Sequence, residues 1–409
     1  MEWIVYVYFI MFFFGIYFLI LFILLYLRNK KVLNDYPKPT KFPKISLITP
    51  AYNEEESIES TIKNLLKLDY PSNKKEIIVV NDGSTDKTVE IVKELMKEYK
   101  GIRLLDKKNS GKADSLNKAI KIATGELIAI VDADSYPARN CIKKTIGYFE
   151  EDEKVAAVTT KVLVKNDKNF IERYQFFDYV VIAWSRKIMD FINSVYVTNG
   201  PFSIYRRDII IKVGGFDPKN MTEDIEITWN LLSKGYKSKM SYSAKVYTIV
   251  PKNLSGWIKQ RIRWNLGGWQ TLHKYRKHFL KGENLFGYFV MNYVALSFLL
   301  ALVGFFLVLR VFFLKGIFYI GGIPFLFQGY NPFKFIEIKF IFSFLLLFGL
   351  IFLVLVLIFY KFAIGREKLK RKNLLTILTY AFIYRPLYII PLVISIFKLI
   401  KGDIRWFTK

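Results

Sequence analysis

The chain has 409 residues but a single cysteine and only two histidines. The lone Cys141 excludes an intrachain disulfide and a cluster of thiolate metal ligands. The only two histidines are His273 and His278, and this small number disfavours both a histidine-rich metal site and a Ser-His catalytic triad. If the protein is an enzyme, carboxylates, lysines and arginines must therefore perform its chemistry.

Charge is missing from three long stretches of a chain that is otherwise rich in lysine and arginine. The uncharged stretches are Trp3–Leu27, Phe286–Leu309 and Phe340–Tyr360, and hydrophobic residues make up 52% of the sequence. Each stretch is long enough to cross a hydrocarbon core, which takes about 20 helical residues. The first is followed by "RNKK" and lacks a small-residue cleavage site. We therefore expect a retained anchor rather than a signal peptide.

A fourth apolar run, Leu374–Phe397, contains Arg385, Pro386 and Pro391. It could span with a kink, lie partly in the interface or re-enter, and the pattern leaves these open. The basic segments "RNKK" and "REKLKRK" (366–372) predict cytoplasmic ends by the positive-inside rule. The region between the first two spans is then cytoplasmic, and Lys315–Lys339 is expected to form an outside loop.

The formal net charge of +26 allows two interpretations. One is a nucleic-acid-binding protein. The other is a cytoplasmic domain held against anionic lipid, with further cations that meet phosphate groups in a site. Because of the apolar spans we favour the second, and we expect no nucleic-acid partner.

Between the first two spans, short β-type runs alternate with helical patterns. "YPKPTKFPK" (36–44) is a proline-broken linker. The runs "KISLITP", "KEIIVV" and "ELIAIV" each lead into a polar loop and then a helix pattern. This alternation predicts an α/β domain with a parallel sheet covered by helices. Ligands of such sheets bind at the carboxyl ends of the strands.

The polar residues after the first two runs have two readings each. Tyr52, Asn53 and Glu54 could stack on and hydrogen-bond a nucleotide base, or the acidic residues could simply begin a helix. In "NDGSTD", a tight turn at Gly83 and a cap from Ser84 or Thr85 explain most of the motif. They do not explain Asp82 at the strand tip, so a nucleotide contact is plausible there.

The third run ends in "DADS", which places Asp132 and Asp134 two residues apart. Two carboxylates there repel unless a cation joins them, and a hard divalent cation shared with a diphosphate is a natural partner. A solvated acidic loop is the alternative. "NSGKAD" lacks the glycine spacing of a phosphate-binding P-loop, so Lys112 is either a cation of the site or a solvated lysine.

Two later segments also carry candidate functional residues. In "TED", Thr222 can cap a helix, whereas Asp224 could act as a general base. The run "GWIKQRIRWNLGGWQ" reads as an amphipathic helix whose Gln260, Arg263 and Trp264 share one face. That face could lie at the membrane surface, or it could bind phosphate and sugar.

In sequence order, "PAYNEE", "NDGSTD", "DADS", "TED" and "QRIRW" resemble the motifs of the membrane-embedded processive glycosyltransferases of family 2. These include cellulose, chitin-oligosaccharide, hyaluronan and poly-N-acetylglucosamine synthases. The resemblance covers about Ile45 to Gln270 and is nearest to the poly-N-acetylglucosamine branch. Compared with some of these synthases, we expect one N-terminal helix instead of two and no appended cyclic-dinucleotide-binding domain.

The resemblance implies a GT-A fold and an assignment for each motif residue. Tyr52, Glu54 and Asp82 would bind the uracil end of a UDP-sugar, and Lys112, Asp132, Gln260 and Arg263 its diphosphate side. Asp134, with Asp132, would hold Mg²⁺ or Mn²⁺. Asp224 would be the catalytic base, and Glu223 and Trp264 would bind the acceptor.

The expected domain order is an N-terminal transmembrane helix (1–30), a linker (31–44), a GT-A domain (45–254), an interfacial amphipathic helix (255–282) and a C-terminal transmembrane region (283–409). The implied activity is inverting transfer, from UDP-GlcNAc as the best guess, to the 4- or 3-hydroxyl at the non-reducing end of a polysaccharide. Coupled translocation and a plasma-membrane location are expected, with unknown accessory or export subunits. The alternative is transfer of one sugar to a polyprenyl phosphate or other lipid.

Overall fold

The computed structural model describes residues 2–282, 285–326, 344–365 and 374–402. The chain divides into two compact units. One contains the described parts of residues 1–24 and 293–365, and the other contains those of residues 25–292 and 366–409. The larger unit carries every motif named above.

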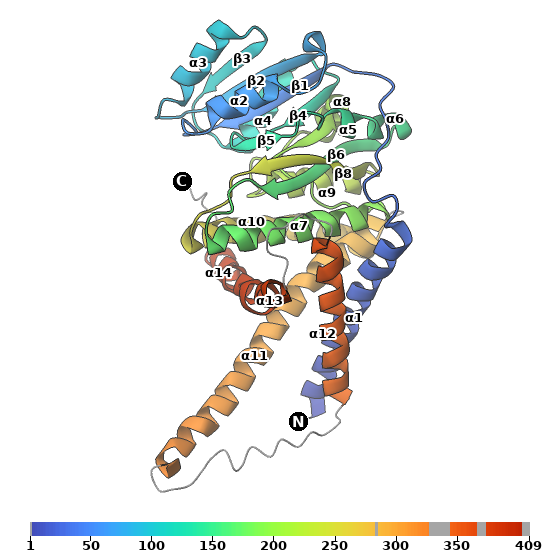
Figure 1. The fold of residues 1–409 in the computed structure, drawn as a ribbon, viewed down its shortest axis with the longest axis vertical. Coiled ribbons are helices and arrows are strands. Elements are labelled where there is room, and N and C mark those ends of the chain that lie inside the picture. The colour runs from blue at the N-terminus through green and yellow to red at the C-terminus, as the bar shows by residue number, and fades with distance from the viewer. Residues whose placement is uncertain (1, 283–284, 327–343, 366–373, 403–409) are drawn as a thin grey trace. The chain divides into compact units, whose positions relative to one another are not determined.

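The larger unit is built on an eight-stranded sheet with the order β3-β2-β1-β4-β7-β6-β8-β5 (Figure 1). Its strands are β1 (Ile45–Ala51), β2 (Lys75–Asp82), β3 (Ile102–Lys107), β4 (Leu127–Ile130), β5 (Ser135–Pro137), β6 (Val155–Val164), β7 (Ser203–Arg206) and β8 (Lys237–Thr248). Strands β1 to β4 pair in parallel, while β7 is antiparallel to both of its neighbours. The predicted parallel sheet is confirmed for β1, β2 and β4.

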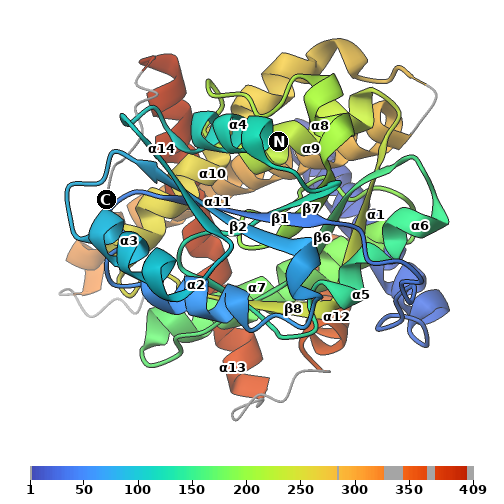
Figure 2. The same ribbon diagram turned by 90° about the horizontal axis from the view of Figure 1, so that it is seen from above.

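Helices cover both faces of this sheet (Figure 2). They are α2 (Ile58–Leu66), α3 (Thr88–Glu98), α4 (Lys112–Ile122), α5 (Lys143–Ile146), α6 (Tyr148–Glu151), α8 (Arg207–Val213) and α9 (Glu223–Ser233), with a 3₁₀ turn at Ser72–Lys74. Residues of α2, α3, α5 and α6 form one buried core with the sheet, and residues of α4, α8 and α9 form a second. Strand side chains alternate between these cores, as the two-residue period of a strand requires.

Two long helices, α7 (Phe170–Asp190) and α10 (Leu254–Tyr275), extend the larger unit beyond its sheet. Asn169 and Glu172 form a capping box that fixes the start of α7, and Asn253 caps α10 by accepting from the Gly256 amide at 2.8 Å. A 3₁₀ turn, Arg276–His278, follows α10. The predicted amphipathic helix is therefore present, and it ends at Tyr275.

The fourth apolar run is a helix with a changed winding in the middle. It consists of α13 (Leu374–Thr379), a π-helical turn (Tyr380–Tyr384), a 3₁₀ turn (Arg385–Tyr388) and α14 (Ile389–Ile400). Pro386 has no amide hydrogen to continue an α-helical ladder, which accounts for the change at that point. In the structure α14 packs against α10, so this run belongs to the larger unit.

The smaller unit contains apolar helices. Its described parts are residues 2–24, which belong to α1 (Glu2–Asn29), then α11 (Met291–Leu326) from Tyr293 onward, and α12 (Phe344–Ile364). A π-helical turn, Phe286–Val290, precedes α11. Gly15 lets α1 approach α12, because a Cβ there would lie 2.8 Å from the ring of Phe352.

Within the described residues, four segments are long and apolar enough to cross a membrane: Trp3–Asn29, Phe286–Arg310, Leu347–Ile364 and Ile377–Ile400. The expected loop Lys315–Lys339 is wrong for its first part, because α11 continues to Leu326. A mostly apolar sequence continues past Lys315, which permits the longer helix. The rest of that loop and the basic segment 366–372 lie outside the described residues.

Candidate active site

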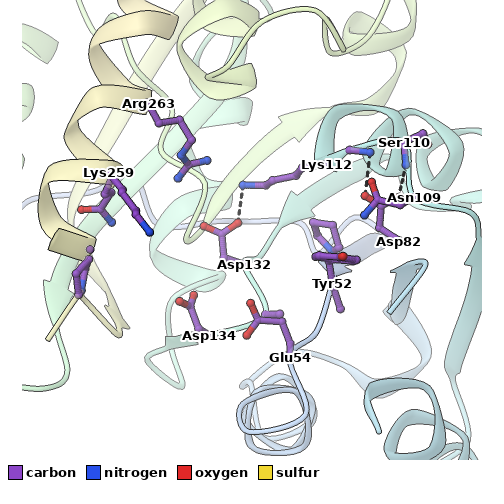
Figure 3. A pocket seen from close by; sticks show the side chains of 17 residues that line it. Tyr52, Glu54, Asp82, Asn109, Ser110, Lys112, Asp132, Asp134, Lys259 and Arg263 are labelled. Carbon is purple, nitrogen blue, oxygen red and sulfur yellow. Dashed lines mark hydrogen bonds and ion pairs between the residues drawn. The ribbon is translucent and has the colours of Figure 1, made fainter. Parts of the chain in front are cut away.

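A cavity of about 710 Å³ lies at the carboxyl ends of β1, β2 and β4 (Figure 3). The α10 helix contributes Lys259, Gln260 and Arg263 to its wall. The remaining predicted donor and metal residues also line it: Tyr52, Glu54, Asp82, Lys112, Asp132 and Asp134. The sequence motifs therefore do meet at one site. Glu223, Asp224 and Trp264 are not among the lining residues.

The loops after β1 and β2 are tied to each other by hydrogen bonds. Asn53 has a positive φ of 52°, and its side-chain oxygen accepts from the Thr85 amide at 2.8 Å. In return, the Ser84 hydroxyl accepts from the Asn53 amide at 3.0 Å. The expectation that Ser84 or Thr85 caps the next helix is wrong, because Lys87 occupies the N-cap position of α3. These polar residues instead shape the loop beside Tyr52.

Asp82, at the tip of β2, fixes the loop that leads into α4. Its carboxylate accepts from the backbone amides of Ser110 and Gly111, both at 2.9 Å, and it pairs with Lys107. The resemblance implied a uracil contact for Asp82. In the structure this carboxylate lines the cavity and also positions the residues immediately before Lys112.

Lys112, the first residue of α4, joins two carboxylates from distant parts of the chain. Its ammonium lies 2.6 Å from Asp132, just after β4, and 2.7 Å from Glu223 at the start of α9. Burial alone would lower the pKa of Lys112, but the two carboxylates more than offset this and raise it above its ordinary value. Lys112 is therefore a cation of the site and not a solvated lysine.

Of the two acids in "DADS", Asp134 suits a divalent cation better than Asp132 does. Asp134 lines the cavity, and its carboxylate accepts long hydrogen bonds from Ser135 at 3.4 Å and Thr248 at 3.5 Å. Asp132 already pairs with Lys112. Among the described residues, no three acidic, histidine or cysteine side chains gather as a metal site. Mg²⁺ commonly takes one or two carboxylates and fills its shell with substrate phosphates and water, so Asp134 fits such an ion.

The "TED" motif begins α9 and places two acids close to these cations. Burial, and after it the neighbouring Glu223, raise the pKa of Asp224 to about 6. Lys112 and Arg263 act to lower this pKa, but their effect is smaller. Burial acts to raise the pKa of Glu223, but Lys112, and after it Arg263 and a backbone amide, together lower it below its ordinary value. Asp224 is thus the carboxyl of this pair that can hold a proton near neutral pH.

Thr222 precedes α9 at the N-cap position but does not cap it through its side chain, so that prediction is wrong. Its amide donates to the Asn220 side chain at 2.9 Å, and its hydroxyl also donates to Asn220 at 3.3 Å. The Thr222 side chain also packs closely against α10, since a Cβ on Gly267 would lie 1.9 Å from the Thr222 hydroxyl oxygen.

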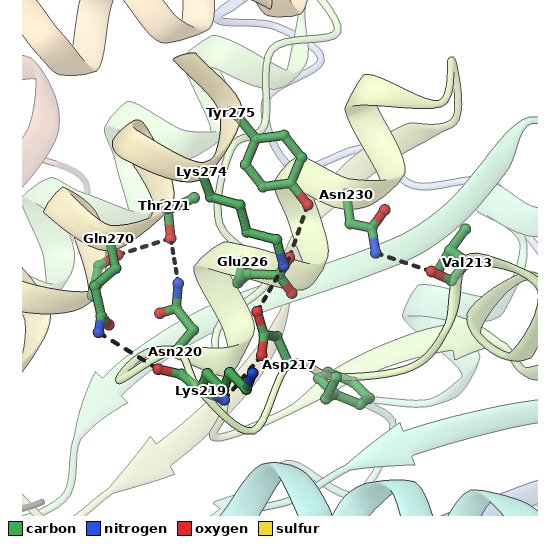
Figure 4. A network of polar contacts seen from close by, with 12 residues as sticks. Val213, Asp217, Lys219, Asn220, Glu226, Asn230, Gln270, Thr271, Lys274 and Tyr275 are labelled. Atoms are coloured by element: carbon green, nitrogen blue, oxygen red, sulfur yellow. Dashed lines mark hydrogen bonds and ion pairs between the residues drawn. The ribbon is translucent and has the colours of Figure 1, made fainter. Parts of the chain in front are cut away.

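Further polar contacts hold the segment around α9 onto α10 (Figure 4). The Gln270 side chain accepts from the Met221 amide at 2.9 Å. The buried Glu226 accepts from Lys274 at 2.6 Å and from the Tyr275 hydroxyl at 2.8 Å. Because Asp224 lies between these anchored residues, α10 sets its position.

Gly200 is a site residue that the sequence reasoning did not assign. A Cβ at Gly200 would lie 2.8 Å from both Lys112 Nζ and an oxygen of Asp132, so only glycine leaves room for that ion pair. Lys259, one residue before Gln260, also lines the cavity and was not predicted. The "NGP" tripeptide at 199–201 was a sequence signal for Gly200. Lys259 had no such signal, because a lysine is common on an amphipathic helix.

Comparison with known proteins agrees with this architecture. Residues 46–214 match the model of glycosyl transferase family 2. Poly-beta-1,6-N-acetyl-D-glucosamine synthase of Staphylococcus aureus (strain COL) is 33% identical over 229 residues, which cover 56% of this chain and 55% of that protein. The enzyme of the same name from Staphylococcus epidermidis is 32% identical over 230 residues, with the same coverage. The chain thus matches about half the length of these relatives.

A solved mannosyltransferase from Pyrobaculum calidifontis, in complex with GDP-Man and Mn²⁺, has the same fold. The TM-score is 0.60 at 21% identity, and the match covers 94% of this chain and 95% of that one. Residues 46–214 are therefore similar to glycosyltransferase family 2 domains, and the fold is of the GT-A type. The described residues also include apolar helices that are candidate membrane spans.

Replacing Gly267 with alanine tests whether α10 positions the "TED" segment. The new methyl group must displace Thr222, so we expect Gly267→Ala to lower glycosyl transfer by about a hundredfold, the order that a 1 Å misplacement costs. Nucleotide affinity, measured by calorimetry, should stay within about twofold, because a displaced "TED" segment leaves the side chains that line the cavity in place.

The matched variant is Gly267→Ala with Thr222→Gly, which removes the side chain that the methyl group meets. Turnover should be partly restored in this pair. A Gly267→Ala protein with unchanged turnover would contradict the positioning.

Proposed function

We propose that the chain transfers N-acetylglucosamine from UDP-GlcNAc to the non-reducing end of a growing β-linked polysaccharide, with inversion at the anomeric carbon. The observation that carries this proposal is the position of Asp224, a carboxyl with a pKa of about 6, beside Glu223, Lys112 and Arg263 next to a cavity of substrate size. The names of the Staphylococcus relatives support N-acetylglucosamine as the sugar. They also favour the 6-hydroxyl over the 4- or 3-hydroxyl expected from the motifs.

In the proposed reaction, an acceptor hydroxyl oxygen attacks the anomeric carbon on the face opposite UDP. The new carbon–oxygen bond forms as the bond to the diphosphate oxygen breaks, and Asp224 takes the hydroxyl proton. A base must be unprotonated before the reaction and able to accept a proton during it, and a pKa of about 6 meets both demands near neutral pH. The single displacement needs no covalent intermediate.

The leaving diphosphate gathers negative charge, which fixed cations at the cavity wall can offset. Lys112 and Arg263 would supply this charge from two different elements, α4 and α10. Such preorganised electrostatic stabilisation is commonly worth about 3 kcal/mol per donor. Asp134, and Asp132 where Lys112 permits, would hold a divalent cation that, when bound, neutralises the same diphosphate.

Tyr52, Glu54 and Asp82 would receive the uracil end, at the ends of β1 and β2. Gln260 also faces the cavity, and its buried side-chain oxygen has no hydrogen-bond partner among the described residues, so it can accept one from the donor. Trp264 and Glu223 are proposed for the acceptor. The four candidate spans would anchor the chain in the plasma membrane with this domain in the cytoplasm, and would line an exit path for the polymer.

The competing activity is transfer of a single sugar to a polyprenyl phosphate or other lipid. The two are separated by the products that detergent-solubilised protein makes from labelled UDP-GlcNAc. A ladder or high polymer that is sensitive to a β-N-acetylglucosaminidase is the expected result. A single lipid-soluble product would overturn the processive proposal, and UDP-glucose and UDP-glucuronate in parallel would show whether the donor is wrong.

The control in that assay is Asp224→Asn, which keeps the size of the side chain but cannot accept the proton. It should bind UDP with unchanged affinity and make no product. Surviving transfer in this variant would show that another group is the base.

The pKa of Asp224 also predicts how the reaction depends on pH. Because the carboxylate is the active form, kcat/KM should fall as the pH drops through about 6. Burial is the main cause of the raised pKa and Glu223 the next. Removing the second carboxylate, in Glu223→Gln, should therefore move the acid limb of the pH profile to lower pH. A limb that stays in place, or moves upward, would contradict the coupling of the two acids.

A further inference from the structure

Asp178, in the middle of α7, is a completely buried acid that joins three parts of the larger unit. Its Oδ2 pairs with Arg261 of α10 at 3.1 Å. Its Oδ1 accepts from the Tyr380 hydroxyl at 3.0 Å and pairs with Arg385 at 3.1 Å, and Tyr388 also donates to Oδ2. None of these residues lines the cavity. Two tyrosines and an arginine from the C-terminal run thus close around an acid of α7.

Arg261 is the second residue of "QRIRW", between the cavity residues Gln260 and Arg263. Only 1% of this arginine is exposed, and the centre of its guanidinium lies 3.9 Å from the ring centre of Trp264. Tyr179, next to Asp178, contacts Trp264 from α7, with ring centres 6.4 Å apart. The indole is therefore covered by a cation that the buried carboxylate holds in place.

Apolar side chains could hold α7, α10 and the C-terminal run together without the ion pair between Asp178 and Arg261. A buried ion pair gains little over apolar side chains of similar volume, because both charges must leave water. Moreover, the Nε and Nη1 atoms of Arg261 are buried without a hydrogen-bond partner in the described part of the chain. A planar cation over an indole face is attracted by the ring, more strongly when water is excluded. The guanidinium of Arg261 lies farther from the ring centres of Tyr388, at 5.1 Å, and Trp257, at 5.9 Å, than from that of Trp264. Trp264 is thus the aromatic ring that this cation contacts most closely among these three.

We propose that Arg261, anchored by Asp178, is a positioning residue that fixes the Trp264 ring for the acceptor sugar. The C-terminal run supplies the other donors that hold Asp178. This inference rests on the proposed function in one respect, that Trp264 receives the acceptor. The positioning of the ring itself does not depend on it.

The test combines acceptor kinetics with a direct probe of the ring in the full-length protein. Arg261→Lys keeps the charge opposite Asp178 but loses the planar group over the indole. With short β-linked N-acetylglucosamine oligomers, its acceptor KM should rise about tenfold, the scale of one desolvated cation–π contact. The KM for UDP-GlcNAc should stay within about twofold, because donor contacts are not the ones removed.

The ring is observed by ¹⁹F NMR of protein labelled with 5-fluorotryptophan, where the Trp264 signal is the one lost in Trp264→Phe. It should shift in Arg261→Lys and also in Asp178→Asn, a near-isosteric second variant. The matched control is Arg385→Lys, which alters the same carboxylate through Oδ1 and should leave the Trp264 signal and the acceptor KM close to wild type.

An unmoved Trp264 signal in both Arg261→Lys and Asp178→Asn overturns the positioning. A shifted signal with unchanged acceptor KM overturns the connection to the acceptor. If neither the wild type nor any variant uses UDP-GlcNAc, the proposed function fails. The NMR signal of Trp264 still shows in that case whether Arg261 positions the ring.

Discussion

The site depends on one largely buried cation. Lys112 lies between Asp132, which follows β4, and Glu223, which begins α9, and these carboxylates are 91 positions apart in the sequence. Without this charge between them, the two acids would repel each other at the edge of the cavity, and Glu223 would keep Arg263 but lose its ion pair with Lys112. Gly200 leaves the space for this pair, and Asp82 fixes the loop that leads to Lys112. Contacts that look structural therefore determine where the charges of the site lie.

The second constraint is the position of α10 over the sheet. One side of this helix contributes Gln260 and Arg263 to the cavity. Further along it, Gly267 packs against Thr222, and Lys274 and Tyr275 bind Glu226, so that together they hold the "TED" segment. Two donor-side residues, Gln260 and Arg263, are thus part of the same helix that holds the segment of the proposed base, so a shift of α10 changes both. The "QRIRW" run thus contributes to the wall of the cavity, as one of its two interpretations required.

Much of this could be predicted from the sequence because the local signals were strong. Apolar runs followed by acidic loops predicted β1, β2 and β4 and the gathering of Tyr52, Asp82 and Asp132 at one sheet edge. What the sequence did not predict were contacts between distant segments. β3 and the strands from β5 onward were not anticipated, Thr222 was wrongly expected to cap α9, and the partners of Asp178 in the C-terminal run lie about 200 residues away. Tertiary packing, which no local pattern encodes, decided each of these.

The central claim is that Lys112 and Glu223 act as a unit, and a double-mutant cycle measures this directly. The rates of UDP release would be compared for wild type, Lys112→Met, Glu223→Gln and the double variant. We expect strong non-additivity, with a coupling free energy above about 1 kcal/mol, since residues in one ion-pair network typically couple by roughly 0.5–3 kcal/mol. In that case the double variant loses little more than Lys112→Met alone. Losses that simply add, with a coupling near zero, would contradict the account.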